Sequence, residues 1–543
     1  MKKSFFMLFA LAQMTFASQL VDGKYVNFED YVDHVENVNG EGFKTLAQYK
    51  TTYVNGSNST RRYVTNTMLQ NAFNAAKAQK AVGVYLPPGV WNFNDQIVVP
   101  HGMTLKGSYD RPHHVTSADL NIVNGNVVWD NTKGTNIACF KGWNWTPFEP
   151  DANDLNRRDV DACIALHGSA TLDGVNVYYP QQNAPVKNQN FNPVKYPWTI
   201  SCQKSGEDWS YFGRCAIMNT TLVNSYAGID LTEANDHFVK GVNMTSFKRG
   251  IRLDQITSLG TIEDINIHTQ FAALYYCPYA YASAWPTDTP ALTQQKADEH
   301  AAFERMESYI LANNIGLEFG WVDWGGLKNV FVYKANKGFY FRRGISGHGS
   351  SGFFRAAPSI DIQNSGCDQC VDAVYVDEVN SGIGVNFSNS NLIGRIYTSD
   401  NNYGPVRITN SYLEYNAAIM GKLPGTNYYS SDHVVVGDKT TMQITNSELM
   451  DFMGDLNGHW LGSTFKVWGN LFVDNTSMVW PDKGQRFDTS ARHVFANSGS
   501  IVSLSNILFR GWEATAGGDG AGDIRISNIL YDALDNGYHP IVR

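Results

Sequence analysis

The sequence predicts an all-β fold in which one chain winds into a stacked coil, a parallel β-helix, with a helix capping its N-terminal end. Three observations predict this architecture: an amphipathic helix over residues 65–80, short alternating strands directly after it, and a five-residue pattern that recurs in the middle of the chain. Because each repeat in such a fold packs only on its neighbours, the 543 residues need not divide into several globular domains.

The capping helix is predicted by "TNTMLQNAFNAAKAQK", residues 65–80. Its apolar residues recur at helical spacing, and Asn66 or Thr67 is suited to the N-cap position. The next segment, "AVGVYLPPGVWNFNDQIVVPHGMTLKGS" at 81–108, alternates apolar and polar residues between turns that contain proline and glycine. That pattern is typical of short strands joined by tight turns.

A capping helix followed by "VYLPPGVWNF" and "VVPHGMTLKG" resembles the start of the right-handed parallel β-helix in the pectin-lyase-like superfamily. The resemblance covers residues 60–108 by motif and the rest of the chain by repeat pattern. It implies a right-handed single-stranded parallel β-helix, in a group that includes pectate lyases, polygalacturonases, other glycoside hydrolases and phage tailspikes. One fold hosts many chemistries, so the resemblance does not choose among these activities.

The recurring pattern has the form small, apolar, X, apolar, Y. Its apolar positions face one side of a strand and form a core when the copies stack, while X and Y face outward. Similar segments continue toward residue 535. The copies are GIDLT at Gly228, GIRLD at Gly250, ALYYC at Ala273, GLEFG at Gly316, GFYFR at Gly338 and AVYVD at Ala373. The X column is therefore Asp230, Arg252, Tyr275, Glu318, Tyr340, Tyr375, and the Y column Thr232, Asp254, Cys277, Gly320, Arg342, Asp377.

The long spacing between the third and fourth copies contains a helix-forming segment. We predict a helical insertion at about 286–314, with Thr289 as its cap and Pro290 in its first turn. It would either wall one side of a groove or shield the flank of the coil. The predicted organisation is a signal peptide at 1–18, an N-terminal extension at 19–60 and a β-helix domain at 61–543.

The first residues have the charge order and length of a signal peptide. Lys2 and Lys3 precede an apolar run at 5–12, and small residues follow at Ala17 and Ser18. This run is too short to remain as a membrane span, and no later run is long enough. We therefore expect a secreted or periplasmic protein. A formal charge of −9 argues against nucleic acid as a partner.

Seven cysteines in an exported chain favour disulfides, with one thiol left over. The C-x-x-C spacing has no second pair for zinc, so structural pairing is the better interpretation. No residues lie at the spacing of a metal site; we expect no cofactor, although calcium stays open. The pairs that could form are Cys202 with Cys215, Cys139 with Cys163, and Cys367 with Cys370.

The outward columns contain the candidate catalytic groups. Glycoside hydrolysis requires two carboxyl groups, about 5–5.5 Å apart for retention and about 6.5–9.5 Å for inversion. Asp254 and Glu318, two rungs apart in the predicted stack, would have Cα atoms roughly 10 Å apart. We predict this pair as catalytic, with Asp230 and Asp323 as further candidates. The alternative is a solvated face on which Asp230–Arg252 and Asp254–Arg342 balance charge, with each ion pair contributing only about 0–1 kcal/mol.

Cations and aromatic rings accompany these carboxyl groups and are predicted to bind the substrate. Arginines beside a carboxylate keep it ionised, and flat rings stack on sugars. A glycine-flanked histidine resembles the Gly-His-Gly of polygalacturonases, but that family's other catalytic motifs are missing. The predicted substrate-binding residues are Arg252, Arg342, Tyr340, Tyr275, Trp321, Trp324 and His348.

Three functions fit these features. The first is a secreted glycoside hydrolase that acts on a polysaccharide or oligosaccharide. The second is a polysaccharide lyase acting on a uronic-acid polymer by β-elimination, which needs a cation for the uronate and a base for the proton. The third is a non-catalytic, adhesin-like sugar binder. The columns hold at least as many carboxylates as cations, which favours a neutral sugar and hence the hydrolase.

Overall fold

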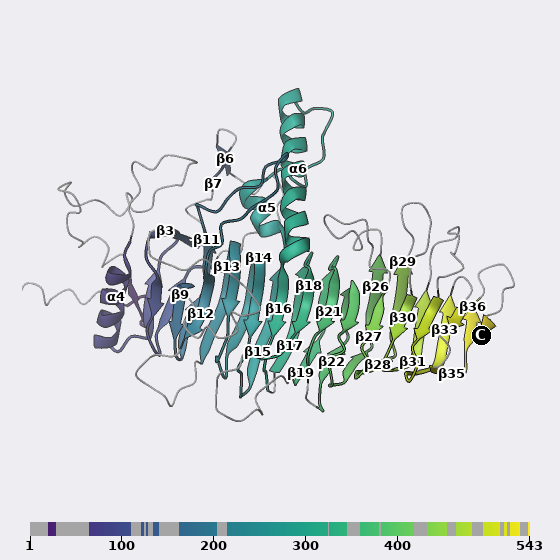
Figure 1. Ribbon diagram of the computed structural model, residues 1–543. Coiled ribbons are helices and arrows are strands. Elements are labelled where there is room, and N and C mark those ends of the chain that lie inside the picture. Colours follow the sequence, from purple (N-terminus) through teal and green to yellow (C-terminus); the bar gives the residue numbers. More distant parts are fainter. Residues whose placement is uncertain are drawn as a thin grey trace, which may run out of the picture.

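The computed structural model shows a long coil with one helical projection (Figure 1). The predicted signal peptide, residues 1–18, lies outside the part of the chain that the structure describes, as do His348 and Trp324. The described residues are 20–28, 64–109, 121–123, 126–128, 134–140, 162–203, 214–323, 325–344, 359–379, 382–416, 432–452, 463–479, 492–510, 515–517, 522–532 and 541–542.

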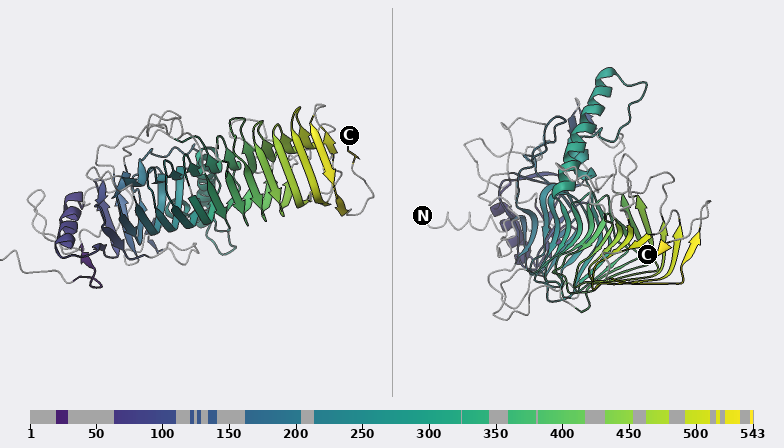
Figure 2. Two further views of the ribbon diagram at one scale, coloured as in Figure 1. Left: turned by 90° about the horizontal axis from the view of Figure 1, so that it is seen from below. Right: turned by 45° about the vertical axis from the view of Figure 1, so that its right-hand side comes forward.

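The coil consists of three parallel sheets, which we name A, B and C in the order in which the chain passes through each turn. Equivalent strands of successive turns pair in register, which confirms the predicted parallel β-helix. Views from below and from the side show the turns stacked along one axis (Figure 2). Apart from an antiparallel hairpin of β6 (Asn121–Val123) and β7 (Asn126–Val128), all the pairing of described strands within the sheets is parallel.

Sheet A holds the predicted five-residue repeats. Its strands are β4 (Ile97–Val99), β9 (Ala162–His167), β12 (Trp198–Gln203), the ends of β13 (Cys215–Asp230) and β14 (Phe238–Leu253), β16 (Ile315–Phe319), β18 (Lys337–Phe341), β21 (Asp372–Val376), β24 (Arg395–Thr398), β27 (Val434–Val436), β30 (Ser463–Val467), β32 (Arg492–Ala496), β34 (Thr515–Gly517) and β37 (Ile541–Val542).

Sheet B begins with a strand from the segment predicted as an N-terminal extension. Its strands are β1 (Tyr25–Asn27), β2 (Gly83–Leu86), β5 (Thr104–Gly107), β10 (Ala170–Asp173), the starts of β13, β14, β15 (Gly260–Ile267) and β17 (Gly325–Tyr333), β19 (Ile360–Gln363), β22 (Val385–Ser388), β25 (Val406–Thr409), β28 (Thr441–Thr445), the starts of β31 (Asn470–Val479) and β33 (Ile501–Arg510), and β35 (Asp523–Ser527).

Sheet C completes each turn. Its separate strands are β3 (Gly89–Phe93), β8 (Thr135–Cys139), β11 (Val175–Tyr178), β20 (Gly366–Asp368), β23 (Asn391–Ile393), β26 (Tyr412–Asn416), β29 (Glu448–Phe452) and β36 (Leu530–Asp532), and later parts of the long strands of sheet B continue into it.

The core lies between the three sheets, as the alternation predicts. The apolar positions of five repeats are buried, including Ile251, Leu253, Leu317 and Phe339. The small first position has a steric cause: a Cβ added to Gly250 would lie 2.2 Å from the carbonyl oxygen of Gly316 on the next turn. Only glycine permits such a close approach of stacked backbones.

The turn between sheets B and C contains a stacked series of left-handed residues. Asn329 and Asn364 have positive φ angles of 55° and 47°. The Asn364 amide donates to Asn329, and the Asn329 amide donates to Asp264 at 2.9 Å. Asn and Asp tolerate this conformation better than other residues with a side chain. The recurring "TNS" of the C-terminal half is the sequence signal of these turns.

The capping helix α4 (Asn66–Ala78) covers the first turn of the coil, with its predicted apolar face buried. Its N-cap is Thr65, one residue before the predicted position, and the Thr65 hydroxyl accepts from Met68 N. Asn66 is not the cap because its side-chain oxygen accepts instead from Val98 N at 3.1 Å. That bond ties the helix to β4 at the edge of sheet A.

The third copy of the repeat, ALYYC, is a helix and not a strand. Residues Gln270–Tyr276 form α5. This helix is the first element of the insertion that separates β15 from β16. A five-residue pattern of small and apolar residues also suits one helical turn, so the pattern alone did not separate the two. As a consequence β14 pairs directly with β16, and Tyr275 does not lie in the outward column.

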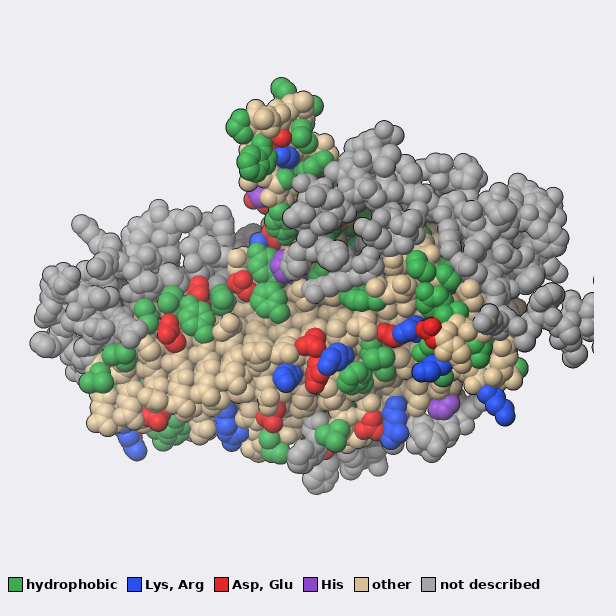
Figure 3. Space-filling model, turned by 180° about the vertical axis from the view of Figure 1, so that it is seen from behind, with side chains coloured by type: hydrophobic (Ala, Val, Ile, Leu, Met, Phe, Trp, Pro, Cys, Tyr) green, Lys and Arg blue, Asp and Glu red, His purple; other side chains and the backbone are tan. Residues whose placement is uncertain are grey.

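The predicted insertion is confirmed as α6 (Pro290–Asn313), with Thr289 as N-cap and proline in the first turn. It rises from the coil as a projection, with hydrophobic side chains visible at its outer end (Figure 3). At its base Glu307 pairs with Lys334 at 2.5 Å and accepts from Thr269 at 3.0 Å. The insertion leads directly into β16, one of the strands that hold the candidate site. No described helix is long and apolar enough to cross a membrane.

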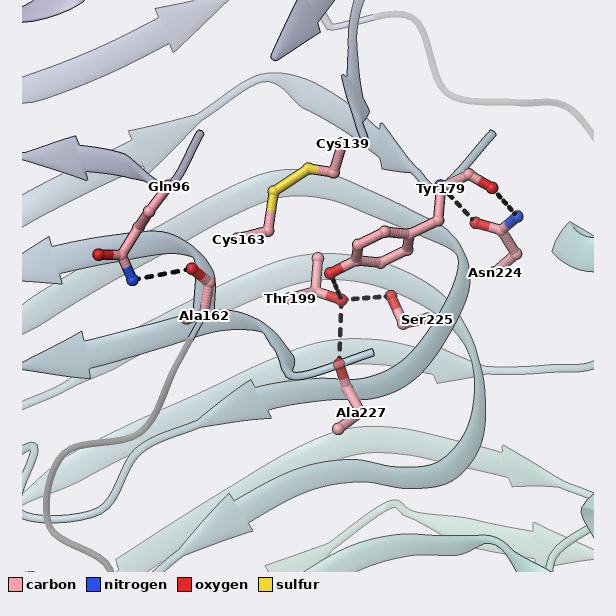
Figure 4. The surroundings of a disulfide bond; sticks show 9 residues. All are labelled: Gln96, Cys139, Ala162, Cys163, Tyr179, Thr199, Asn224, Ser225 and Ala227. Atoms are coloured by element: carbon pink, nitrogen blue, oxygen red, sulfur yellow. Dashed lines mark hydrogen bonds between the residues drawn. A yellow bond between two sulfur atoms is a disulfide. The ribbon is translucent and has the colours of Figure 1, made fainter. Parts of the chain in front are cut away.

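Three disulfides form as the sequence suggested, and two of them join strands of different sheets. Cys139–Cys163 connects β8 to β9, and beside it the hydroxyls of Tyr179, Thr199 and Ser225 form a buried hydrogen-bonded chain (Figure 4). The other bonds are Cys202–Cys215 and Cys367–Cys370, and the remaining thiol, Cys277, is buried.

Candidate functional site

One row of outward residues crosses sheet A over successive turns. Backbone register places Asp230, Arg252, Glu318, Tyr340 and Tyr375 side by side in that order, and Tyr397 follows. Adjacent strands of a sheet lie about 4.8 Å apart. The prediction that Asp254 and Glu318 lie two turns apart is therefore wrong: the intervening copy is helical, and their strands are neighbours.

The first half of the row is a network of alternating acids and arginines. Arg252 donates two hydrogen bonds to Asp230, at 2.9 and 3.1 Å. Arg342 bridges Glu318, at 2.5 Å, and Asp254, at 3.0 Å. Each of these five side chains belongs to a residue that is at most 7% exposed. The predicted residues do share one wall, but they are largely satisfied by one another.

Glu318 lies at the centre of this network and is ionised. Arg249 contacts its second oxygen at 2.7 Å. Burial by itself raises the pKa of the Glu318 carboxyl, but the guanidinium groups of Arg342, Arg249 and Arg252 outweigh burial and lower the pKa to about 2. At neutral pH this carboxylate can accept a proton or orient a nucleophile, but it cannot donate a proton.

Asp254 occupies a supporting position. It is fully buried, and its Oδ1 accepts from Gln255 N at 2.8 Å and from Trp321 N at 2.9 Å. The neighbouring turn also crowds it, since a Cβ on Gly320 would lie 2.2 Å from its carboxyl group. These contacts fix the end of the strand and hold Arg342 in place, and they leave no face of Asp254 for a substrate.

Arg342 retains one unused donor. Its Nη2 is buried and has no hydrogen-bond partner among the residues that the structure describes, although Nε and Nη1 are both paired. Glu318 and Asp254 raise the pKa of the guanidinium against the opposing effect of burial, which is the largest single influence. A buried unpaired donor is costly and calls for an acceptor. Beside the ionised Glu318, an oxygen of a ligand or a water could supply it.

The second half of the row is an accessible aromatic surface, which we call the tyrosine wall: Tyr340, Tyr375 and Tyr397. All three are partly exposed, with ring centroids 5.4 and 4.8 Å apart along the row. The ammonium of Lys337 lies 3.9 Å from the Tyr340 ring centroid and 3.7 Å from that of Tyr375. Burial lowers the pKa of Lys337 and raises that of Tyr375 to about 12.

Two acids beside this wall were not selected from the sequence. Asp377, in the Y column, is partly exposed, and among the described residues its carboxylate has no recorded partner. Asp372 is buried beside Arg395, at 2.5 Å, and burial raises its pKa against the effect of that arginine. The sequence shows their position in the repeat. It does not show whether each carboxylate is exposed or paired, because the side chains of neighbouring turns decide that.

The remaining predicted site residues lie elsewhere. Tyr275, on α5, packs at 5.6 Å from Tyr178 of sheet C and so is absent from the sheet A wall, which corrects its predicted role. Trp321 and Asp323 are partly exposed on the turn from sheet A to sheet B, where Asp323 N donates to Ile256 O at 2.9 Å. In the described part of the chain, no group of three or more His, Cys, Asp or Glu is placed to hold a metal ion.

The chain has the parallel β-helix fold that its resemblance to the pectin-lyase-like superfamily implies. No family model and no curated protein matches it. Similar solved structures include a DFA-IIIase mutant from Arthrobacter chlorophenolicus A6 in complex with DFA-III, at 10% identity and a TM-score of 0.31, covering 87% of this chain and 90% of that chain.

Two further solved structures are similar to this chain at the same level. The surface protein and adhesin PfbA of Streptococcus pneumoniae has 10% identity and a TM-score of 0.31, covering 96% of this chain and 100% of that chain. The catalytic domain of a GH87 α-1,3-glucanase in complex with nigerose has 10% identity and a TM-score of 0.31, covering 89% and 67%. At this level of similarity the matches assign no activity, substrate or site residue to this chain.

Proposed function

We propose that the protein is an exported carbohydrate-active enzyme that cleaves glycosidic bonds on the outer wall of sheet A. One observation supports this most directly: the row that contains the ionised Glu318 continues without interruption into the accessible tyrosine wall. Tyrosine rings offer flat apolar faces together with hydroxyls, which suits the amphipathic faces of sugar rings. Sugars bound on this wall would reach the charged network at its end.

The reaction that we propose is hydrolysis. Glu318, which stays ionised, acts as the base that takes a proton from the attacking water, and Asp377 is the second carboxyl group, the acid that gives its proton to the departing glycosidic oxygen. The two residues lie two turns apart across the sheet, and Asp377 is displaced by two residues along the strand direction. Their Cα atoms are therefore about 12 Å apart. Side chains that lean together across that separation suit the wider carboxyl spacing of inverting enzymes, about 6.5–9.5 Å. Asp230 and Asp254 become positioning residues, which hold Arg252 and Arg342.

The decisive experiment separates cleavage from binding. Release of reducing ends from a panel of neutral plant, algal and microbial glycans is measured for the wild type and for Glu318→Gln, Asp377→Asn and the exposed control Glu304→Gln. We expect at least about a hundredfold loss of turnover for the first two variants, since each loses a proton-transfer group. Binding to the cleaved glycan, measured by calorimetry, should persist. If the wild type binds glycans without cleaving them, the protein is an adhesin-like binder and the hydrolase proposal fails.

A lyase is the second candidate, because of Lys337 and Arg342. Burial favours the neutral amine of Lys337, which could remove the C5 proton of a uronate, while the free donor of Arg342 could bind its carboxylate. The electron pair released at C5 would form the C4–C5 double bond and expel the C4 oxygen. Ultraviolet absorbance of that unsaturated product identifies a lyase, and its absence during reducing-end release identifies a hydrolase.

A further inference from the structure

A groove lies on the outer face of sheet B, away from the tyrosine wall of sheet A. It crosses the starts of β15, β17 and β19 and has a volume of about 520 Å³. Ligand pockets typically range from roughly 300 to 1,000 Å³. The proposed hydrolysis uses none of the residues that line it. Those that matter here are Thr261, Glu263, Gly326, Lys328, Asp361 and Gln363.

A missing side chain creates the hollow. In the sheet register Gly326 lies between Thr261 and Asp361, in a row of outward positions. A Cβ added to Gly326 would meet no atom within 4 Å, so packing does not require glycine here. Gly326 lies within β17 and has no positive φ angle that would require glycine, and strands usually favour a residue with a side chain. The open floor is therefore a candidate for function.

The walls combine apolar and polar surfaces. Leu259, 67% exposed, and Ile383, 49% exposed, lie among the lining residues as apolar contact surfaces. The next outward row, Glu263, Lys328 and Gln363, offers both hydrogen-bond donors and acceptors. Lys328 has no recorded partner among the described residues.

The charges in this groove balance in number: Glu263 faces Lys240, and the negative charge of Asp361 is offset by the positive charge of Lys328. Glu263 pairs with Lys240 at 2.9 Å, and Asp361 accepts from the Asn386 amide at 2.9 Å. A polyanion would face both of these acids, and a polycation would face Lys240 and Lys328. A ligand with many hydroxyls, apolar ring faces and no net charge matches this surface best.

We propose that this groove binds a neutral oligosaccharide segment, as a sugar site separate from the tyrosine wall. Lys328 and Gln363 would bond its hydroxyls, while Leu259 and Ile383 contact its ring faces. The floor at Gly326 lets the sugar approach the backbone. Because the two sites lie on different sheets, loss of one should leave the other intact, and binding here does not depend on cleavage.

The test uses the full-length protein carrying Glu318→Gln, titrated calorimetrically with cellohexaose, laminarihexaose and mannohexaose. We expect two binding events with at least one of these sugars. Gly326→Val should weaken one event about tenfold or more by filling the floor, and Lys328→Ala should weaken the same event. Tyr375→Ala should weaken only the other event.

The matched control is Gln443→Val. Gln443 is an exposed residue of β28, and it lies in the same outward row of sheet B as Gly326 but outside the groove. It should leave both events unchanged, and circular dichroism should show that all variants are folded. An unchanged isotherm for Gly326→Val, or no binding by any of the three sugars, overturns the proposal. If only the event sensitive to Tyr375→Ala is seen, the tyrosine wall binds sugar and the groove does not.

Discussion

The ionisation of Glu318 gives a prediction whose magnitude and pH range both follow from the structure. Folding lowers its pKa from the ordinary value of 4.5 to about 2. Each pH unit of that difference corresponds to about 1.4 kcal/mol, so the ionised carboxylate contributes about 3 kcal/mol to the free energy of unfolding at neutral pH. Because the folded pKa is the lower one, this stability is present above pH 4.5 and is lost as the pH falls toward 2.

Replacing Glu318 by Gln keeps its shape and removes its charge, leaving Arg249 and Arg342 without their carboxylate. We expect the variant to be at least about 3 kcal/mol less stable than the wild type at pH 7, within the range for breaking a buried ion pair. Between pH 4.5 and pH 2 that deficit should shrink by about 3 kcal/mol as the wild-type carboxylate becomes protonated. Urea unfolding followed by tryptophan fluorescence at a series of pH values measures the difference.

The matched control is Glu304→Gln, because the Glu304 side chain is 62% exposed. Its unfolding free energy should differ from the wild type by less than about 0.5 kcal/mol at every pH. A deficit of Glu318→Gln that stays constant from pH 6 to pH 2.5 would refute the reasoning, since it would mean that the carboxylate has the same pKa in the folded and unfolded chain.

Three further outcomes are expected. Gly250→Ala should lower the unfolding free energy by about 1–3 kcal/mol, seen as a lower thermal midpoint, because its Cβ would collide with Gly316. Opening the Cys202–Cys215 loop by Cys215→Ser should cost about 2–4 kcal/mol, and mass spectrometry under non-reducing conditions should show one more free thiol. Thr65→Ala should cost about 1 kcal/mol through loss of the helix cap, whereas Thr65→Ser should cost little; equal losses would contradict the capping role.

Much of the fold could be predicted because its signals are local and repeated. The alternation of buried and exposed residues in Gly250–Asp254 is set by strand geometry within a few residues, and the same signal returns in Gly316–Gly320. Caps and helix periodicity likewise depend on neighbours in sequence, so α4 and α6 lie where expected, with the cap of α4 displaced by one residue.

The site was predicted only in part, because pairing is decided by which turns stack. Arg252, Glu318 and Arg342 were correctly assigned to one outward wall. The pairs Asp230–Arg252 and Asp254–Arg342 of the alternative interpretation also form, but they are buried and not solvated as that interpretation had them. Asp377 lies in the predicted Y column but was not selected as a candidate. Nothing in the neighbouring sequence distinguishes an accessible acid such as Asp377 from a buried one such as Asp254.

The sequence by itself determined that this chain winds as a parallel coil, which residues face its core, and where its capping helix and its projection begin. Tertiary structure alone decided that residues 273–276 leave the coil as part of a helix, and that Arg252 and Glu318 become neighbours. The physical reason is range: side-chain alternation acts over a few residues, whereas the partner of a strand across a long insertion is chosen by packing and backbone hydrogen bonds from the whole stack.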